Sequence, residues 1–483
     1  MRSNLPEPAT AGVPPGAERR RWPALGVGLV AAFMALLDVS IVNVAVPSIE
    51  RSLGATSSDL AWVLSGYALT FGLALVPAGR FGDARGRRTV FAVGLALFTL
   101  TSAAAGLAGS PTWLVVARLL QGAAAGLVSP QVTGLIQQMF APAERGRPFG
   151  LLGATIGLST AVGPLLGGLL IRLGGPDHGW RWVFFVNVPV GLVTVLLGWR
   201  FVPARGGTGT RSLDPVGVLL LGAGVVALLL PLVQREHWPG AQKWLLVPAG
   251  LVALAAFAWW ERRYARHGEP LFDLALFRIR SYALGSLVAL VYFAGFTAIF
   301  FVFTLYLQNG LGYDALTAGL AITPFALGSA VASALGGRLV NRYGRSLVTV
   351  GLCLVAAGLV VVALLGAARP GPGLPWLLVA PLTVAGLGSG LVITPNQTLT
   401  LAEVPVPRAG SAAGMLQTGQ RLGAAAGIAA VGAVFFGILE AAAADWSPAF
   451  RDALLVAVGF VLLALVVDLA DNLAGRRRRR RPR

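Results

Sequence analysis

Two charged residues lie inside long apolar stretches, where a charge is costly. Asp38 lies in the string LLDVSIVNVAVP and Arg118 in the string VARLLQGAAAGLVSP. A carboxylate near the centre of a membrane helix costs roughly 2.5–3.5 kcal/mol on insertion scales, and such residues commonly form proton relays or ion sites. The sequence therefore predicts that Asp38 couples protons to transport across a membrane. A purely structural ion pair is the alternative.

The same two residues lie at similar depths in their predicted spans. At about 1.5 Å of rise per residue, Asp38 lies roughly 12 Å from the outer end of its span, and Arg118 roughly 9 Å from the outer end of its own. Burial favours the protonated acid, whereas a neighbouring guanidinium favours the carboxylate. If the two helices adjoin, this competition provides a protonation switch.

The rest of the chain supplies membrane-spanning elements that position these charges. Of 483 residues, 56% are hydrophobic and only 12% are charged, whereas soluble domains are about one quarter charged. Apolar stretches of about 20 residues, long enough to cross about 30 Å of hydrocarbon, recur throughout. Fourteen spans are predicted, at 22–46, 59–79, 89–109, 112–139, 148–172, 182–202, 214–234, 244–260, 280–306, 316–339, 347–368, 376–400, 409–438 and 452–471.

The net charge of +18 predicts an orientation in the membrane. With the N-terminus inside, the inner segments hold 29 of the 38 Lys and Arg residues, the outer loops hold seven and the spans hold two. Inner loops of membrane proteins carry such an excess of positive charge. We therefore expect a multi-pass protein of the cell membrane with both termini in the cytoplasm, and no nucleic-acid partner.

One internal repeat divides the chain into halves. AGRFGDARGRRTV, which begins at Ala78, is similar to GGRLVNRYGRSLV, which begins at Gly336. Parallel halves of this kind are a known transporter plan, with the substrate bound between them near the midplane. The predicted organisation is a disordered cytoplasmic tail at 1–21, a six-helix bundle at 22–205, two inserted helices at 206–275, a second six-helix bundle at 276–472 and an Arg-rich cytoplasmic tail at 473–483.

These motifs resemble those of the major facilitator superfamily, and within it the fourteen-span drug:proton antiporter branch. The strings around Asp38 and Arg118 resemble the first-span and fourth-span signatures, and WRWVFFVNVPVG at 180–191 resembles the start of the sixth span. The resemblance covers about residues 22–470. It implies an all-α fold of two six-helix bundles plus two inserted helices, and links the fourth-span signature to proton coupling. We interpret the sixth-span string as structural.

The first copy of the repeat resembles the superfamily signature between spans two and three. Asp83 can accept hydrogen bonds from a helix N-terminus or from an Arg, so the cluster can latch the inner side closed. A role in topology alone is the alternative. The second copy has Asn341 in place of Asp83, and any latch there should be weaker. The predicted inner-gate residues are Gly79, Arg80, Asp83, Gly86, Arg87 and Arg88.

The fifth span resembles a signature that the family associates with export. The glycine spacing in GATIGLSTAVGPLLGGLL permits close helix approach, and a proline inside a helix bends it. Close packing without a role in direction is the alternative. The residues of this predicted antiporter motif are Gly157, Gly163, Pro164, Gly167 and Gly168.

Polar side chains within the spans are candidates for substrate contact, although an interhelical hydrogen bond is the alternative for each. Arg421 is the one charge clearly inside a second-half span, so it needs a partner or water. No acid lies in spans nine to thirteen, and by resemblance this disfavours dicationic substrates. The candidates are Asn43, Tyr67, Gln121, Gln131, Asn396, Gln397, Gln417 and Arg421.

Together these patterns predict proton-coupled efflux (antiport) of small amphipathic compounds such as drugs or antibiotics. The alternatives are an exporter dedicated to one secondary metabolite or lipid, and a non-transporting membrane sensor on the same fold. The three His residues show no metal-ligand spacing, and we find no phosphate-binding loop. We expect a monomer in the lipid bilayer that is not an enzyme, has no metal or cofactor, and is driven by the proton gradient.

Overall fold

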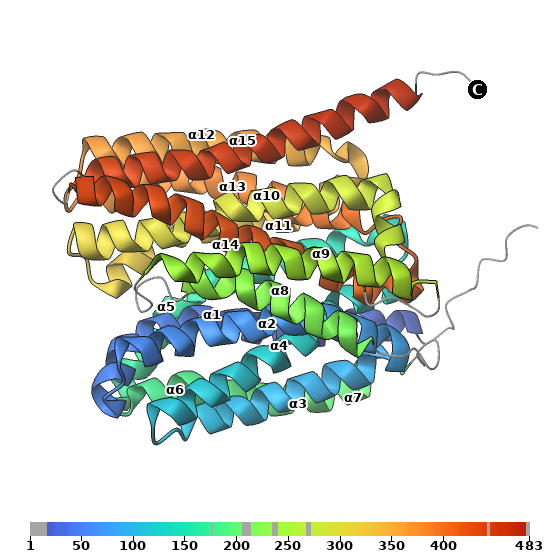
Figure 1. The fold of residues 1–483 in the computed structure, drawn as a ribbon, viewed down its shortest axis with the longest axis horizontal. Helices are drawn as coiled ribbons and strands as arrows, with labels where there is room; N and C mark the ends of the chain where they lie inside the picture. Colours follow the sequence, from blue (N-terminus) through green and yellow to red (C-terminus); the bar gives the residue numbers. More distant parts are fainter. Residues whose placement is uncertain are drawn as a thin grey trace, which may run out of the picture.

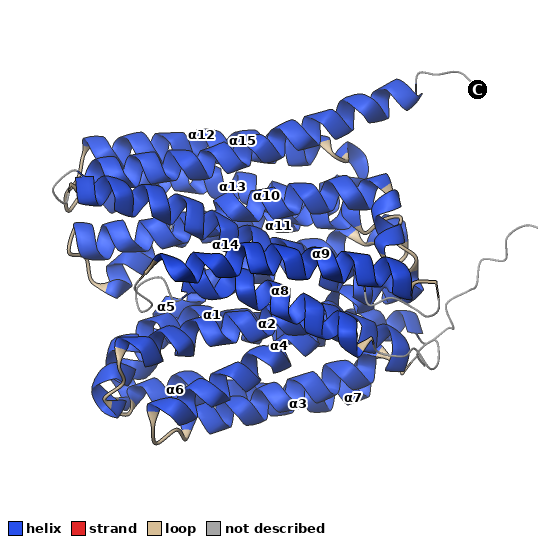
Figure 2. Cartoon of the chain, in the orientation of Figure 1, coloured by secondary structure: helices blue, strands red, loops and turns tan. Residues whose placement is uncertain are grey.

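The computed structural model describes residues 17–175, 177–204, 214–233, 240–266, 272–441 and 445–479. Figure 2 shows only helices and loops in these residues, with no strand. Thirteen helices are long and apolar enough to cross a membrane, and a shorter apolar helix spans Pro215–Leu228. The predicted all-α polytopic fold is therefore confirmed. The remaining predicted span, 214–234, coincides with the helix that contains this shorter segment.

The first half forms one layer of the molecule, at the bottom of Figure 1. The single span predicted at 182–202 consists of two helices that meet at Val186. Pro189 explains the break, because it has no N–H to donate to the preceding turn. The helices of this half are α1 (Ala17–Leu53), α2 (Ser57–Arg85), α3 (Arg87–Gly106), α4 (Pro111–Met139), α5 (Gly146–Gly174), α6 (Gly179–Phe185) and α7 (Asn187–Phe201).

The second half forms the other layer, and two helices lie in front of the seam between the layers (Figure 1). These two, α8 (Pro215–Val233) and α9 (Leu246–Tyr264), pack on each other, and α8 also contacts α2 and α14. The second half comprises α10 (Arg280–Leu305), α11 (Ala315–Tyr343), α12 (Ser346–Ala368), α13 (Leu374–Thr400), α14 (Ala409–Ala441) and α15 (Trp446–Arg479).

Two predicted tails are shorter than expected. Helix α1 begins at Ala17, so residues 17–21 are helical rather than disordered, and Arg21 pairs with Glu144 at 2.8 Å. Helix α15 continues to Arg479, into the segment predicted as a tail. Arg is a good helix former, so a helix propagates readily through these residues. Residues 1–16 and 480–483 lie outside the described residues.

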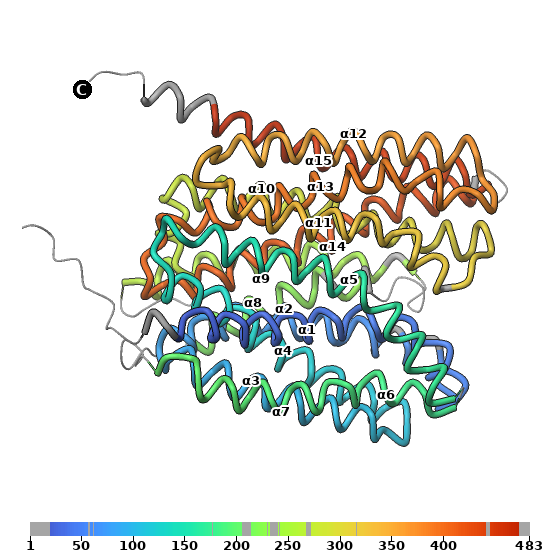
Figure 3. The backbone as a smooth tube through the Cα atoms, turned by 180° about the vertical axis from the view of Figure 1, so that it is seen from behind, coloured from blue at the N-terminus to red at the C-terminus, as the bar shows by residue number. Residues whose placement is uncertain are grey.

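A stripe of small residues joins the two halves along α5 and α11, which run side by side in Figure 3. A β-carbon at Gly146 would lie 2.2 Å from the carbonyl oxygen of Gly337, and one at Gly157 would lie 2.7 Å from that of Ala326. Gly150 and Gly153 lie between them on the same face of α5, against the backbone and side chain of Ser333. Small residues at helical spacing allow this backbone-to-backbone approach.

Candidate functional site

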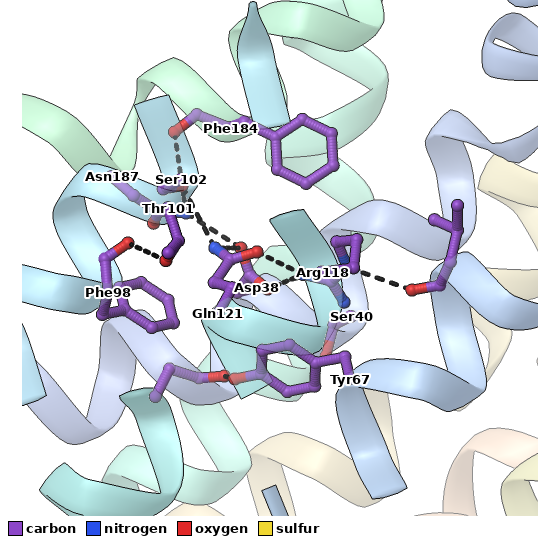
Figure 4. A network of polar contacts seen from close by, with 12 residues as sticks. Asp38, Ser40, Tyr67, Phe98, Thr101, Ser102, Arg118, Gln121, Phe184 and Asn187 are labelled. Atoms are coloured by element: carbon purple, nitrogen blue, oxygen red, sulfur yellow. Dashed lines mark hydrogen bonds and ion pairs between the residues drawn. The ribbon is translucent and has the colours of Figure 1, made fainter. Parts of the chain in front are cut away.

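The carboxylate of Asp38 is fully buried and accepts hydrogen bonds from three side chains (Figure 4). Arg118 forms an ion pair with Oδ2 through Nη1. Gln121 and Asn187 each donate to Oδ1 at 2.9 Å, from α4 and α7 respectively. The structure thus brings the two charges predicted from the sequence together, in a site built by α1, α4 and α7. Such charge-assisted bonds are about twice as strong as neutral ones.

Arg118 is held in place by contacts beyond Asp38. Its Nε donates to the carbonyl of Val63 at 3.0 Å, and its Nη1 also donates to Oε1 of Gln121 at 2.7 Å. The guanidinium carbon lies 4.2 Å from the centre of the Tyr67 ring, and the Tyr67 hydroxyl donates to the carbonyl of Ala35 at 3.0 Å. These contacts position the cation in addition to Asp38.

Sequence reasoning missed two members of this network, Asn187 and Ser102. The Ser102 hydroxyl accepts from both Gln121 and Asn187 at 3.1 Å and donates to the carbonyl of Phe184 at 3.0 Å. Asn187 belongs to the sixth-span string, which we interpreted as structural. At about 1.5 Å of rise per residue it lies roughly 7.5 Å from the outer end of its predicted span, close to the depth of Arg118. The depth argument applied to Arg118 would therefore also have identified it.

The first copy of the repeat lies at the end of the molecule that carries the Arg-rich loops, and it reaches across the seam. Asp83 accepts from the backbone N–H groups of Gly410 at 3.0 Å and Ser411 at 2.8 Å, and from the Ser411 hydroxyl at 2.9 Å. These groups belong to the first turn of α14, where the helix dipole favours a negative charge. Gly79 permits the approach, because a β-carbon there would lie 2.2 Å from the Gly410 carbonyl oxygen.

The other residues of this motif support Asp83 and the turn. Arg87 donates to Asp83 at 2.8 Å and to the Val406 carbonyl across the seam at 2.7 Å. Gly86 has a φ of +95°, which favours glycine between α2 and α3. Arg80 is buried, and Arg88 donates to the Trp199 carbonyl within the first half. Asp83 and Arg87 therefore contact the second half directly, as Gly79 does.

The second copy of the repeat makes different contacts. Asn341 donates to the carbonyl of Ala143 in the α4–α5 loop. Arg345 corresponds to Arg87, but it pairs with Asp471 at 2.9 Å and lies 3.6 Å from Asp468. Both acids belong to α15, so this cation stabilises the second half internally. The sequence analysis had not identified either acid.

The predicted antiporter motif of α5 divides between two faces. Gly157 faces α11 of the second half, whereas Gly163 packs on Ser40 and Gly167 on Ile41, both in α1. Pro164 contacts the position of Gly319 in α11. A β-carbon on Gly168 would meet nothing within 4 Å. Four of the five residues therefore lie at helix contacts.

The pocket candidates fall into four groups. Gln121 belongs to the Asp38 site, and Tyr67 packs under Arg118. Gln131 and Asn396 are buried and donate to backbone carbonyls of neighbouring helices, at 2.7 Å and 2.9 Å. Asn43 is exposed and Gln397 is partly buried. Two candidates contact the opposite half: Gln417, which accepts from Ser129 at 2.8 Å, and Arg421, which lies over the ring of Phe71.

Comparison with known proteins assigns the fold to a family. The model of the Major Facilitator Superfamily matches residues 28–428 and 285–482, in two overlapping matches. The chain belongs to the Major Facilitator Superfamily. As a member of this superfamily it is a polytopic membrane transporter, as its helices and buried charges predicted.

Relatives and a solved structure agree with this assignment. The probable actinorhodin transporter of Streptomyces coelicolor is 39% identical over 90% of this chain and 75% of its own length. The puromycin resistance protein pur8 of Streptomyces alboniger is 37% identical over 94% of this chain and 91% of its own. The crystal structure of human MFSD10, at 16% identity, superposes with a TM-score of 0.68 over 94% of this chain and 100% of that chain, which shows a common fold.

Proposed function

We propose that this chain is a proton-coupled antiporter that exports small amphipathic compounds from the cell. The observation that carries the proposal is the buried Asp38 carboxylate, which is held by Arg118, Gln121 and Asn187. A carboxylate at this depth is expensive to maintain and is a functional site by default.

Protonation of Asp38 changes the contacts within this site. The ionised carboxylate accepts from all three donors, whereas a neutral acid loses the charge that holds Arg118. Arg118 retains Val63 and Tyr67 as partners in either state. A proton that enters from outside therefore weakens the contacts of α1 with α4 and α7. Arg118 keeps its other contacts when this happens.

The motion that this change drives would open and close the Arg-rich end. Asp83 holds the first turn of α14 there, and the glycines of α5 and α11 lie in contact beside it. Breaking the Asp83 contacts separates the two halves at the end that we assign to the cytoplasm. We propose that both termini lie on that side, in the cell membrane, and that the monomer transports without a cofactor.

The names of the relatives also support a narrower version of this function. One relative is a probable transporter of actinorhodin and another is a puromycin resistance protein. Each name specifies a single compound, so an exporter dedicated to one metabolite is the second candidate. Dye and antibiotic panels distinguish the two, because a dedicated exporter gives resistance to one compound class only.

Transport into everted membrane vesicles with an acidic interior tests the coupling. Asp38→Asn should lower the initial rate of pH-driven dye uptake at least tenfold while the protein remains in the membrane. Asp314→Asn is the control, because Asp314 is a helix-capping acid with little burial. Wild-type coupling in Asp38→Asn overturns the proposal, and restored coupling in Asp38→Glu shows that the carboxylate is what matters.

A further inference from the structure

Arg421 is a partly exposed charge in the middle of α14, and it has no acidic partner among the described residues. It lies twelve residues after the start of α14 at Ala409, which places it roughly 18 Å along the helix axis. No described ion pair involves it, and helices α10 to α13 contain no Asp or Glu. Its contact with Phe71 places its guanidinium carbon 4.6 Å from the ring centre, across the seam.

An aromatic pair connects Arg421 to the Asp38 site. Phe71 stacks on Tyr67 with ring centres 6.2 Å apart and planes 16° apart, and Tyr67 carries Arg118 on its ring at 4.2 Å. Two guanidiniums thus flank one stacked pair on α2. Arg118 is neutralised by Asp38, whereas Arg421 is not neutralised by any described residue.

The charge on Arg421 needs more compensation than its contacts provide. Removal of an ion from water costs several kcal/mol even after relaxation, and the partly exposed Arg421 incurs part of this cost. A cation–π contact returns about 0.5–1 kcal/mol at an exposed site and about 2 kcal/mol at a desolvated one. A guanidinium offers five N–H donors that match a carboxylate. The described residues therefore supply no anion to this site, and a transported compound is the component that could supply one.

We propose that Arg421 binds an anionic group, a carboxylate or phenolate, on an aromatic substrate whose rings contact Phe71. This inference rests on the proposed export function and specifies its substrate class. A cation at the same place would be repelled by Arg421, so the site discriminates by charge.

The proposal constrains how the transport is driven. Protonation of Asp38 makes its surroundings more positive, so a bound proton does not repel a bound anion. Exchange of the proton for the anion therefore depends on the contacts that open and close between the two halves. One anion leaving while one proton enters moves two positive charges inward. The membrane potential should therefore drive export of the anion, in addition to the pH gradient.

Two dyes with the same ring skeleton provide the test in everted vesicles. Fluorescein carries a carboxylate and a phenolate, whereas rhodamine 123 is a cation whose carboxylate is methylated. Arg421→Gln should lower the initial rate of fluorescein uptake at least tenfold and leave rhodamine 123 unchanged or faster. Arg421→Lys should stay within about threefold of the wild type, and Arg369→Gln, which removes an exposed arginine at the end of α12, should match the wild type.

Binding of fluorescein to the purified protein gives a second measurement that does not require the variant to transport. Fluorescein should raise the midpoint of thermal unfolding of the wild type and of Arg421→Lys, but not that of Arg421→Gln, because only binding to the native state stabilises it. The inference fails if Arg421→Gln slows both dyes equally, or if fluorescein does not stabilise the wild type. Failure of the export function itself has another signature, since Asp38→Asn would then retain wild-type coupling with either dye.

Discussion

The two copies of the internal repeat close the same end of the molecule by different chemistry. Both place a glycine against the backbone of the opposite half, Gly79 on Gly410 and Gly337 on Gly146. The first copy then adds the Asp83 side chain, whose carboxyl oxygens accept from the N-terminus of α14, whereas the second adds one bond from the Asn341 amide. Both copies therefore share the close backbone packing, and only the first copy adds an acidic side chain. Closure should therefore depend more on the first copy.

The interiors of the two halves differ in the same way. The first half buries Asp38 and Arg118 with a shell of amides and hydroxyls. In the second half, a neutral bond of 2.8 Å joins the Tyr292 hydroxyl to Ser389, within a large apolar core. The first half thus buries an ion pair beside the contact between the halves, whereas the buried acid of the second half, Asp468, lies in α15 beside Arg345.

The largest effect should follow loss of the charge where the first copy of the repeat contacts α14. Asp83→Asn replaces charge-assisted bonds to α14 with neutral ones, a loss on the order of 2 kcal/mol, which is about 30-fold in the ratio of open to closed states. A cysteine at Ser333, which is fully buried at the α5–α11 seam, reports opening through maleimide labelling on a background with Cys353 replaced. Equal labelling of wild type and Asp83→Asn would leave the motif only a topological role.

Removal of Arg118 should shift the pH dependence of transport. Arg118→Ala takes away the cation that stabilises the ionised Asp38, so protonation occurs at higher pH. A buried charge-assisted bond of about 1.5–3 kcal/mol corresponds to an upward shift of the profile by one to two pH units. Tyr292→Phe, which removes a buried hydrogen bond to Ser389 in the second half, should leave the profile in place. An unchanged profile in Arg118→Ala, with transport still measurable, would show that the ion pair is structural.

Loss of the amide from α7 should produce the same shift on a smaller scale. Asn187→Ala removes one of the donors to Asp38, so the profile should move upward by about one pH unit, the equivalent of about 1.4 kcal/mol. The pH profile of dye uptake measures it, and Asn187→Gln tests whether an amide alone suffices. A lower rate with an unmoved profile would assign Asn187 to packing.

The smallest effect should come from the contact that the second copy of the repeat makes with the α4–α5 loop. Asn341→Ala removes one neutral hydrogen bond to Ala143, worth about 1 kcal/mol, so labelling at position 333 should rise about fivefold. If Asn341→Ala opens the Arg-rich end as far as Asp83→Asn does, then closure does not depend more on the first copy of the repeat.

Much of the candidate site could be predicted from residue type and depth. The rise of a helix placed Asp38 and Arg118 at one level, and the structure joins them. Asn187 was missed because the string that contains it was interpreted as structural, although it donates to Asp38 from 149 residues away in the chain. Gln121 was predicted to contact substrate, but in the structure it donates to Asp38.

The sequence by itself determined the membrane-spanning helices, their approximate ends and the charges inside them. Helix formation and membrane insertion depend on local composition and length, and both can be read from a single sequence. Only the tertiary structure decided that Asp83 meets α14, that Arg345 turns to α15, and that Arg421 faces Phe71. These partners depend on the rotation and packing of helices far apart in the chain, and packing sets that rotation.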